Sequence, residues 1–540
     1  MRLTVLFSAL FVAVFATAIS GGFAHAQTAP VSLTAANGSE AGSVALSWDA
    51  FPGVTNYTVG WLAVEDYEAN REDQEWLKYF AYSNVGATQS WTVRRLTPGI
   101  DYWLIACESL NDVAPGATPQ CTGWERLTLA AGPACPATGE PATTTPTPTD
   151  GTDYDSDNDG LIEVATIDQL DAIRYDLDGD GASEDDAYAA AFPNAADGMG
   201  CPSDGCIGYE LVADLDFGSS VSAQGWEPIG YYNSDDDYAG FNAVFEGNDH
   251  TISNLYISRN DTYNVGLFGW AGAESVIRQV RLLNVSVIGQ NHVGGLVGWN
   301  DGSIGDSYVT GNVVGDLDFG GLVGRQGEAG SITRSYATAS VSGRQSSGGL
   351  VGRNDGQISA SYATGNSAAS GPNAGGLVAY NTGTIAASYA TGSATSGDDV
   401  GGLVGENTAS GTITASYATG NVTAVGTSGY RDYGGLVGHN QGTIADSYAT
   451  GHLMIRGSNG RSGGFVGYGS GAVNHSYWDT ETSGLSSSAG GLGKTTVELQ
   501  EPTGATGIYA TWNPSWWDFG TSSQYPVLKV EGLDVAAQRP

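Results

Sequence analysis

Gly294-Gly295-Leu296-Val297-Gly298 is one of five copies of a string that recurs along this chain and indicates its architecture. The other copies begin at residues 320, 348, 401 and 434, and variants occupy 265–269, 375–379 and 463–467. Most copies are followed by an isoleucine and then by Ser-Tyr-Ala-Thr-Gly or a near copy, with a period of 26 to 33 residues. A unit this short cannot bury a core alone, whereas stacked units can. The repeats therefore predict a β-helix, or solenoid, of about eight coils.

The repeat also predicts which side chains face inward. The string leucines should stack as one interior ladder, because the flanking glycines let the backbone turn where a Cβ would clash. They are Leu296, Leu322, Leu350, Leu377, Leu403 and Leu436. Within Ser-Tyr-Ala-Thr-Gly, Tyr and Thr share one strand face while Ser and Ala share the other with a following valine. We expect the small residues inside, and the alternative is an inward tyrosine stack that serves as core.

An outward row of tyrosines and threonines would form a strip suited to binding a glycan or a partner protein, because its rings and hydroxyls offer stacking and polar contacts. The residues predicted for this binding face are Tyr336, Tyr362, Tyr389, Tyr417, Thr338, Thr364, Thr391 and Thr419.

These repeats resemble GLUG motifs, which are found in large bacterial surface and secreted proteins, including the amino-terminal parts of IgA-specific metallopeptidases. The segment from Phe245 to Leu255 and the closing Ser476-Tyr-Trp-Asp479 belong to the same resemblance. It implies a β-helical stalk or adhesive rod and no common catalytic residue. No histidine of this sequence stands in a His-Glu-x-x-His arrangement, so the zinc centre of those peptidases cannot be carried over.

Two runs of alternating carboxylates precede the repeats and predict calcium sites. The first contains Asp153, Asp155, Asp157, Asp159 and Glu163, and the second contains Asp176, Asp178, Asp180 and Glu184. Ca²⁺ takes six to eight oxygen ligands, and the glycine that follows each run lets the loop turn sharply. In an EF-hand, position twelve of the loop is a glutamate. Counted from Asp155 and Asp176, that position holds Thr166 and Ala187 here, so Glu163 or Glu184 should complete the shell of ligands. A solvated acidic turn is the alternative.

The acidic runs bracket a predicted helix at 167–175, for which Thr166 and Gln169 have capping-box spacing. Residues 153–206 are therefore predicted as an acidic calcium-binding loop-helix-loop.

The amino-terminal part of the sequence predicts that the chain is exported and that it contains a separate β-sandwich domain. An apolar run after Arg2 and the Ala24-His-Ala26 site describe a secretory signal peptide over 1–26. Short alternating strands over 30–131 resemble a fibronectin type III module, and 132–152 is a Pro/Thr-rich linker. In an exported chain we expect two disulfides, Cys107–Cys121 and Cys201–Cys206, with Cys135 unpaired.

The composition of the chain argues against two classes of function, nucleic-acid binding and catalysis. The 540 residues carry 20 Lys and Arg against 58 Asp and Glu, a formal net charge of −38, which excludes a basic nucleic-acid footprint. Acidic residues fall irregularly in the coils, mostly near turns, and the Gly-x-Ser-x-Gly string at 460–464 runs straight into a repeat core. Both observations disfavour an enzyme.

The sequence therefore predicts an all-β protein with a sandwich, the acidic segment, a solenoid over 207–480 and a C-terminal cap over 481–540. The expected function is that of an exported, non-enzymatic, adhesin-like protein, secreted or on a bacterial cell surface, that engages a glycan or surface partner. Ca²⁺ is its expected cofactor, and the mature chain has no predicted membrane span. A glycan-processing β-helix and a passive spacer are the alternatives.

Overall fold

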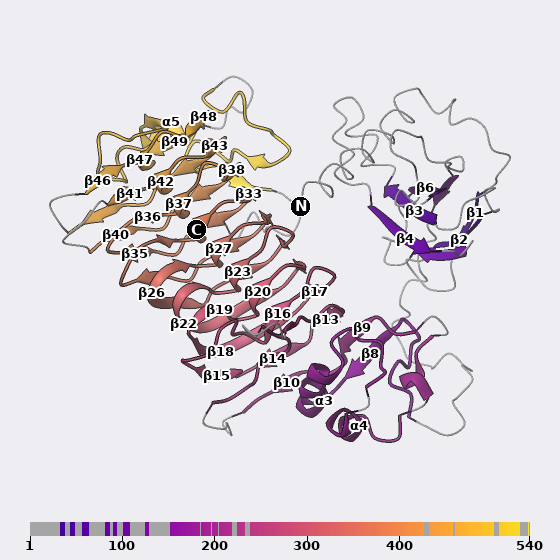
Figure 1. Ribbon diagram of the computed structural model, residues 1–540. Coiled ribbons are helices and arrows are strands. Elements are labelled where there is room, and N and C mark those ends of the chain that lie inside the picture. The colour runs from indigo at the N-terminus through magenta and orange to yellow at the C-terminus, as the bar shows by residue number, and fades with distance from the viewer. Residues whose placement is uncertain are drawn as a thin grey trace. The chain divides into compact units, whose positions relative to one another are not determined.

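The computed structural model describes the backbone of seven strands within residues 1–145 and most of the chain after residue 151 (Figure 1). The described part of the second region is 152–529 with Gln538, apart from 184, 196, 203–204, 219–223, 233–237, 426–430, 457–459 and 502–506. The chain divides into two compact units, 1–145 and 146–540.

The first unit contains two antiparallel sheets. One is formed by β1 (Leu33–Asn37), β2 (Val44–Trp48) and β5 (Ser90–Val93), and the other by β4 (Ala81–Gly86), β3 (Tyr57–Ala63), β6 (Asp101–Glu108) and β7 (Glu125–Thr128). The strands expected from the alternating pattern are therefore present. The signal peptide, the linker up to residue 151, Cys121, Cys135 and the side chain of Cys107 lie outside what the structure describes, so the predictions that concern them stay predictions.

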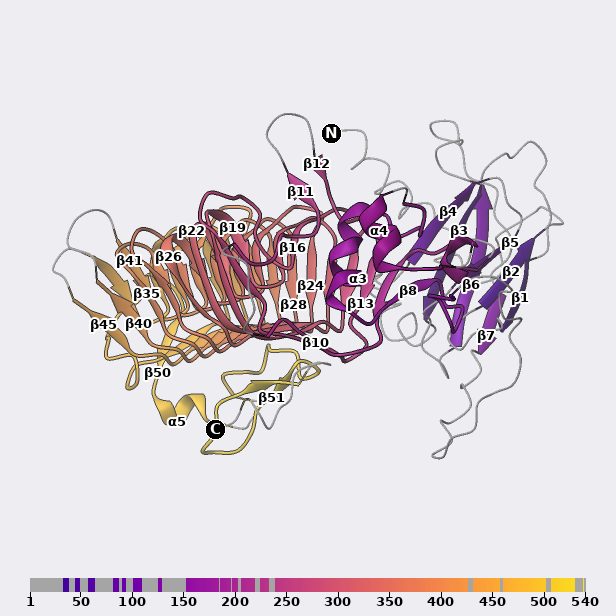
Figure 2. The same cartoon turned by 90° about the horizontal axis from the view of Figure 1, so that it is seen from below.

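The second unit is a parallel β-solenoid of about eight coils, as predicted, and it has three sheet faces (Figure 2). The Gly-Leu-Val-Gly strings form an eight-stranded sheet with the strings in register, so that Val351 lies between Val323 and Val378. Its strands are β16 (Phe268–Ala271), β20 (Val297–Asn300), β23 (Val323–Gln326), β27 (Val351–Asn354), β32 (Val378–Asn381), β37 (Val404–Asn407), β42 (Val437–Asn440) and β47 (Val466–Gly469).

The second face is an eleven-stranded sheet centred on the isoleucines that follow each string. Its strands are β8 (Leu161–Val164), β9 (Gly208–Leu211), β13 (Val244–Glu246), β17 (Val276–Arg278), β21 (Ser303–Gly305), β24 (Ser331–Thr333), β28 (Gln357–Ser359), β33 (Thr384–Ala386), β38 (Thr412–Thr414), β43 (Thr443–Ala445) and β48 (Ala472–Asn474).

The third face contains the Tyr-Ala pairs and the strands that lead back to the next string. Its 22 strands are β10 (Leu215–Asp216), β14 (Thr251–Ser253), β15 (Tyr256–Arg259), β18 (Arg281–Gly289), β19 (Asn291–Gly294), β22 (Tyr308–Gly320), β25 (Tyr336–Ala337), β26 (Ser340–Gly348), β29 (Tyr362–Ala363), β30 (Ser367–Ala369), β31 (Ala374–Gly375), β34 (Tyr389–Ala390), β35 (Ala394–Ser396), β36 (Val400–Gly401), β39 (Tyr417–Ala418), β40 (Val422–Ala424), β41 (Asp432–Gly434), β44 (Tyr448–Ala449), β45 (Leu453–Ile455), β46 (Arg461–Gly463), β49 (Tyr477–Asp479) and β50 (Leu492–Lys494).

The predicted leucine ladder forms the interior. All six string leucines have no exposed surface, and the backbone N–H of each donates to the equivalent residue of the next coil, as Leu350 N–H does to Leu377 O at 2.9 Å. The equivalent residue is a leucine for the first five and Phe465 for Leu436. The glycines are required by this close approach, because a Cβ on Gly349 would lie 2.1 Å from Gly376 O. The alanines of the Tyr-Ala pairs and Val341 are buried in the same core, as expected.

Two ladders of polar side chains run through the buried corners of the coils and were not predicted. Asn354 donates from Nδ2 to Asn381 Oδ1 at 2.7 Å, and the pattern continues through Asn407 to Asn440 at 2.8 Å. The serine that precedes each tyrosine, such as Ser361, accepts a hydrogen bond from the serine N–H of the previous coil and donates to a backbone carbonyl of its own coil. Each coil thus satisfies buried polar groups of its neighbour.

The acidic segment belongs to the solenoid. β8 pairs in parallel with β9, and Ile162, Leu170 and Tyr209 are buried in the same core as the coils, so the solenoid begins before the boundary expected at residue 207. The predicted helix is present as α3 (Ile167–Ala172) followed by the 3₁₀-helix η2 (Ile173–Tyr175), with the capping box in place. Two further helices, α4 (Asp186–Ala191) and the 3₁₀-helix η3 (Asp197–Gly200), were not predicted.

The C-terminal segment only partly caps the end of the solenoid. β50 adds one strand beside β49, and the chain then folds back along the side of the last coils through α5 (Thr496–Leu499), β51 (Trp517–Asp518) and β52 (Val527–Leu528) (Figure 2). Its aromatic residues pack on the tyrosines of the third face. Among the described residues, no helix combines the length and apolar character needed to cross a bilayer.

Candidate functional site

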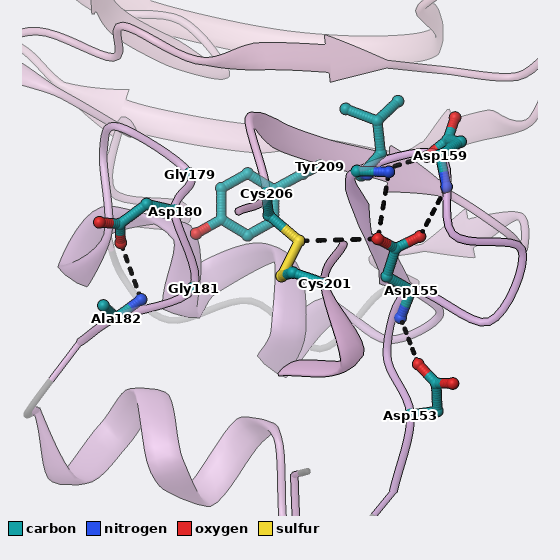
Figure 3. Close-up of a disulfide and its surroundings, with 12 residues drawn as sticks. Asp153, Asp155, Asp159, Gly179, Asp180, Gly181, Ala182, Cys201, Cys206 and Tyr209 are labelled. Carbon is teal, nitrogen blue, oxygen red and sulfur yellow. Dashed lines mark hydrogen bonds between the residues drawn. A yellow bond between two sulfur atoms is a disulfide. The ribbon is translucent and has the colours of Figure 1, made fainter. Parts of the chain in front are cut away.

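The first acidic loop is built around the buried carboxylate of Asp155 (Figure 3). This carboxylate accepts hydrogen bonds from the backbone N–H groups of Asp159 at 3.0 Å and Gly160 at 3.1 Å, while its own N–H donates to Asp153. One carboxylate oxygen from each of Asp155, Asp157 and Asp159 lies within 4.8 Å of the others. Burial, together with the charges of Asp159 and Asp157, raises the pKa of Asp155 to about 7. The loop therefore concentrates negative charge that a cation would stabilise.

Glu163 lies beside this loop and does not complete its cluster of three. Its carboxylate accepts hydrogen bonds from the N–H and the hydroxyl of Ser156. It is also in register with the buried Glu210 on β9. Burial, together with the charges of Asp159, Asp157 and Glu163, raises the pKa of Glu210 to about 7, although the Asn248 hydrogen bond opposes the shift. Sequence reasoning missed Glu210, which only the pairing of β8 with β9 brings to the loop.

The second acidic loop repeats this design around Asp176. Its carboxylate is 5% exposed and accepts hydrogen bonds from the N–H groups of Gly179 and Gly181 and from two tyrosine hydroxyls. Carboxylate oxygens of Asp176, Asp178 and Asp180 converge within 4.8 Å. A hydrogen bond with Asp176, then burial and the charge of Asp180, raise the pKa of Asp178. Glu184 lies outside the described residues.

The disulfide Cys201–Cys206 forms as predicted and lies against the first acidic loop (Figure 3). The Sγ atom of Cys206 is 3.8 Å from Asp155 Oδ2. The bridge closes a short loop just before β9, so it helps to hold the first loop and the first rung of the solenoid together.

The tyrosine row lies on the outer side of the coils, opposite the alanines of the core. The rings of successive tyrosines from Tyr308 to Tyr448 stack with centroids 4.6 to 5.0 Å apart and planes within 9° of parallel. Each ring face is therefore covered by the next ring. The row presents ring edges and hydroxyls, so the expected stacking platform for sugars is not what the geometry offers.

Part of the predicted binding face is covered. Tyr389 and Tyr417 are only 4% and 1% exposed, because Trp517 and its aromatic neighbours from the C-terminal segment pack over them. The expectation that these two tyrosines are available to a ligand is therefore wrong. Tyr336 and Tyr362 are half-buried.

The threonines beside this row are exposed in three of four coils. Thr338, Thr364 and Thr391 are exposed, and Thr419 is half-buried.

A cavity of about 520 Å³ opens at the amino-terminal end of the solenoid, beside the second acidic loop. Three aromatic residues from separate elements line it: Tyr175 of η2, Tyr231 of β11 (Tyr231–Tyr232) and Trp270 of β16. β11 pairs with β12 (Tyr238–Ala239). Asp178 and Asn242 add polar groups to the lining. Sequence reasoning missed this cavity, since only the folding of the acidic segment against the first coils brings its parts together.

The fold defines the class of protein, a β-solenoid of stacked repeats joined to an amino-terminal β unit. Within this class, three segments of the chain, 289–314, 396–423 and 429–453, match the family described as the GLUG motif. The resemblance of the repeats is thereby confirmed for these segments.

Two relatives match shorter stretches. Halomucin of Haloquadratum walsbyi is 39% identical over 121 residues, which are 22% of this chain and 1% of halomucin. A putative Gly-rich membrane protein of Evansella cellulosilytica is 34% identical over 106 residues, 19% of this chain and 12% of that protein. The chain thus spans only a small part of the length of these relatives.

Among solved structures, the fn3 domain of the human collagen alpha-1(XX) chain is similar at 15% identity, with a TM-score of 0.17. The match covers 22% of this chain and 96% of that domain. At this TM-score the identity of the amino-terminal unit as a fibronectin type III module stays a prediction.

Proposed function

We propose that this protein is an exported, non-enzymatic repeat protein of a bacterial cell surface that binds glycan in the cavity beside its second acidic loop. The observation that carries the proposal is the convergence of Tyr175, Tyr231 and Trp270 on one cavity of about 520 Å³. Ligand cavities are typically 300 to 1,000 Å³, lined by aromatic side chains with a few polar groups. Flat rings with a polar edge suit the apolar faces and hydroxyls of sugars.

The surface location is supported by the similarity of the repeats to larger repeat proteins, one of which is named a putative Gly-rich membrane protein. The predicted signal peptide points in the same direction. The amino-terminal β unit would then act as a spacer or second binding module, as fibronectin type III modules do.

The cavity favours binding over cleavage. Glycoside hydrolysis commonly requires two carboxylates that flank the scissile bond. Of the two acidic residues in the lining, Asp178 is exposed, whereas Asp176 is 5% exposed and accepts hydrogen bonds from backbone N–H groups and tyrosine hydroxyls. The Asp176 carboxylate is therefore engaged within the loop.

The test is binding of the full chain to a panel of bacterial and host glycans. The variant Tyr175→Ala/Tyr231→Ala should bind at least about tenfold more weakly, since truncating a central aromatic contact commonly costs more than 1 kcal/mol. Both side chains are more than 40% exposed, so folding should be preserved. The matched control is Tyr263→Ala/Trp516→Ala, two exposed aromatic residues outside the cavity lining.

Equal binding by the cavity variant and the control would place any glycan site elsewhere. New reducing ends or unsaturated products in the same incubations would favour the glycan-processing alternative. If the chain bound no glycan and no cell surface, the proposal would be contradicted, and a passive spacer would be the remaining function.

We also propose that the two acidic loops bind Ca²⁺. The convergence of three carboxylates in each loop supports this, because hard cations prefer oxygen ligands. Adding Ca²⁺ to the calcium-free full chain should raise its melting temperature, by the equivalent of about 2.7 kcal/mol at a hundred times the dissociation constant. The full chain is needed because Ile162 and Tyr209 share the core of the coils.

Calorimetric titration and thermal unfolding provide the measurement. The variant Asp157→Asn/Asp180→Asn removes one exposed carboxylate from each loop and should weaken binding. Asp261→Asn/Glu274→Gln makes the same charge change at exposed sites outside the loops and should leave it unaltered. No heat and no shift in melting temperature with Ca²⁺ would show that the loops are solvated acidic turns.

A further inference from the structure

Three side chains with metal-ligating atoms meet on the outer side of the later coils, outside the acidic loops. Asp399 directly precedes β36, Asp432 begins β41 and His439 lies in β42. One oxygen of each aspartate and one ring nitrogen of His439 lie within 4.8 Å of one another. The side chains of His439, Asp399 and Asp432 are 21%, 17% and 2% exposed. We call these three residues the His439 cluster.

The register of the coils brings the cluster together. Val400 pairs with Tyr433, which places Asp399 one coil below Asp432. His439 occupies the outward position of its Val-Gly-x-Asn strand, where the neighbouring coils carry Glu406 and Tyr468.

The distances within the cluster fit an ion better than direct hydrogen bonds. His439 Nδ1 is 3.5 Å from Asp432 Oδ2 and 3.9 Å from Asp399 Oδ2. N–H···O hydrogen bonds are usually about 2.7 to 3.2 Å long. Ligand atoms that each lie about 2.0 to 2.1 Å from a tetrahedral zinc ion are roughly 3.3 to 3.4 Å apart. A small inward movement of the imidazole would reach that geometry.

Neighbouring groups hold the ligand atoms in place. Arg461 donates two hydrogen bonds to the carboxylate of Asp432, at 2.6 and 2.9 Å. The N–H of Asp432 donates to Asp399 Oδ1 at 3.2 Å, and the amide of Gln441 lies 3.3 Å from His439 Nε2. The Nδ1 atom of His439 faces the two carboxylates.

The charges around the cluster favour a divalent cation. The acidic groups that act on it are Asp398, Asp399, Glu406 and Asp432, and the guanidinium groups are those of Arg431 and Arg461. Carboxyl groups therefore outnumber guanidinium groups around the cluster, and a divalent ion would stabilise the ionised carboxylates.

We propose that Asp399, Asp432 and His439 bind a zinc ion, with Glu406 beside His439 as a fourth side chain. An imidazole with carboxylates suits zinc and similar first-row metals, whereas calcium prefers oxygen ligands alone. This site is separate from the proposed calcium loops and does not depend on the proposed glycan binding.

Neighbouring coils supply conservative variants for the test. Asn373 occupies the position of Asp399 one coil below, and Tyr468 occupies that of His439 one coil above. Asp399→Asn and His439→Tyr should therefore fold. The control is His475→Asn, at an exposed histidine outside the cluster.

The experiment is calorimetric titration of the tag-free full chain with zinc chloride in saturating Ca²⁺. We expect one zinc per chain and a higher melting temperature. Asp399→Asn and His439→Tyr should each weaken binding at least about a hundredfold, since even an outer partner of a metal ligand typically contributes ten- to a hundredfold. His475→Asn should bind like the unaltered chain.

Absence of zinc binding by the unaltered chain would overturn the proposal. The proposal would also be overturned if both cluster variants bound zinc as tightly as the unaltered chain. A loss of affinity in His475→Asn as large as in the cluster variants would overturn it too, because either result would place the ion elsewhere.

Discussion

Replacing Leu350 by Asp should lower the free energy of unfolding of the solenoid by at least about 3 kcal/mol. Leu350 has no exposed surface and lies between Leu322 and Leu377, whose backbones are hydrogen-bonded to its own at 3.0 and 2.9 Å. Truncating a buried leucine typically costs about 2 to 5 kcal/mol, and burying an unpaired carboxylate adds to that. The aspartate has no basic partner inside the ladder of leucines.

Chemical denaturation monitored by circular dichroism measures this effect. Leu350→Met keeps the volume and should cost less than about 1.5 kcal/mol. Gln357→Asp introduces the same charge at an exposed position of β28 in the same coil and should change stability little. An unaltered unfolding transition in Leu350→Asp would refute the interior ladder.

The variant Tyr389→Ser/Tyr417→Ser should release the C-terminal segment from the side of the coils. Both rings are buried beneath that segment, and the Tyr417 hydroxyl donates to Gln538 at 3.0 Å. Removing a buried aromatic ring typically costs about 3 to 5 kcal/mol, so the pair should weaken the hold on the segment, which Tyr448 and Tyr477 also contact.

Limited proteolysis with mass spectrometry would detect this release as new cleavage between residues 496 and 529. The matched control is Tyr308→Ser/Tyr336→Ser, which removes two half-buried rings of the same row away from the segment, and we expect it to lose clearly less stability and to keep the segment protected. Equal protection in both variants would show that the contact with the coils is not what holds the segment.

Much of the solenoid can be predicted from the sequence, because one physical constraint is repeated in every coil. Glycines such as Gly349 stand where a Cβ would meet the carbonyl of the next coil, and the leucine that follows can then enter the core. The period reports the coil length directly. The alternation within Ser-Tyr-Ala-Thr-Gly likewise predicts correctly that the alanine, and not the tyrosine, faces the core.

The missed features depend on contacts between segments that do not share the repeat. Trp517 covers Tyr417 from a hundred positions further along the chain, and nothing in the repeat indicates this. The cavity needs the acidic segment to fold back onto the first coils. The asparagine ladder, in contrast, had a signal in the sequence, since Asn354, Asn381 and Asn407 each follow their string at the same spacing.

The asparagine ladder has defined ends, and this bears on assembly. Below the ladder, Asn300 donates to the Gln326 side chain, and Gln326 donates to the Gln357 carbonyl. Ala271 stands one coil below Asn300, and Gly469 stands one coil above Asn440. Neither residue has a side-chain amide, so the coils at both ends cannot extend the ladder onto another molecule. An open stack of parallel strands is a template for fibril growth. The side-chain ladder therefore joins coils within this chain and adds nothing to end-to-end polymerisation.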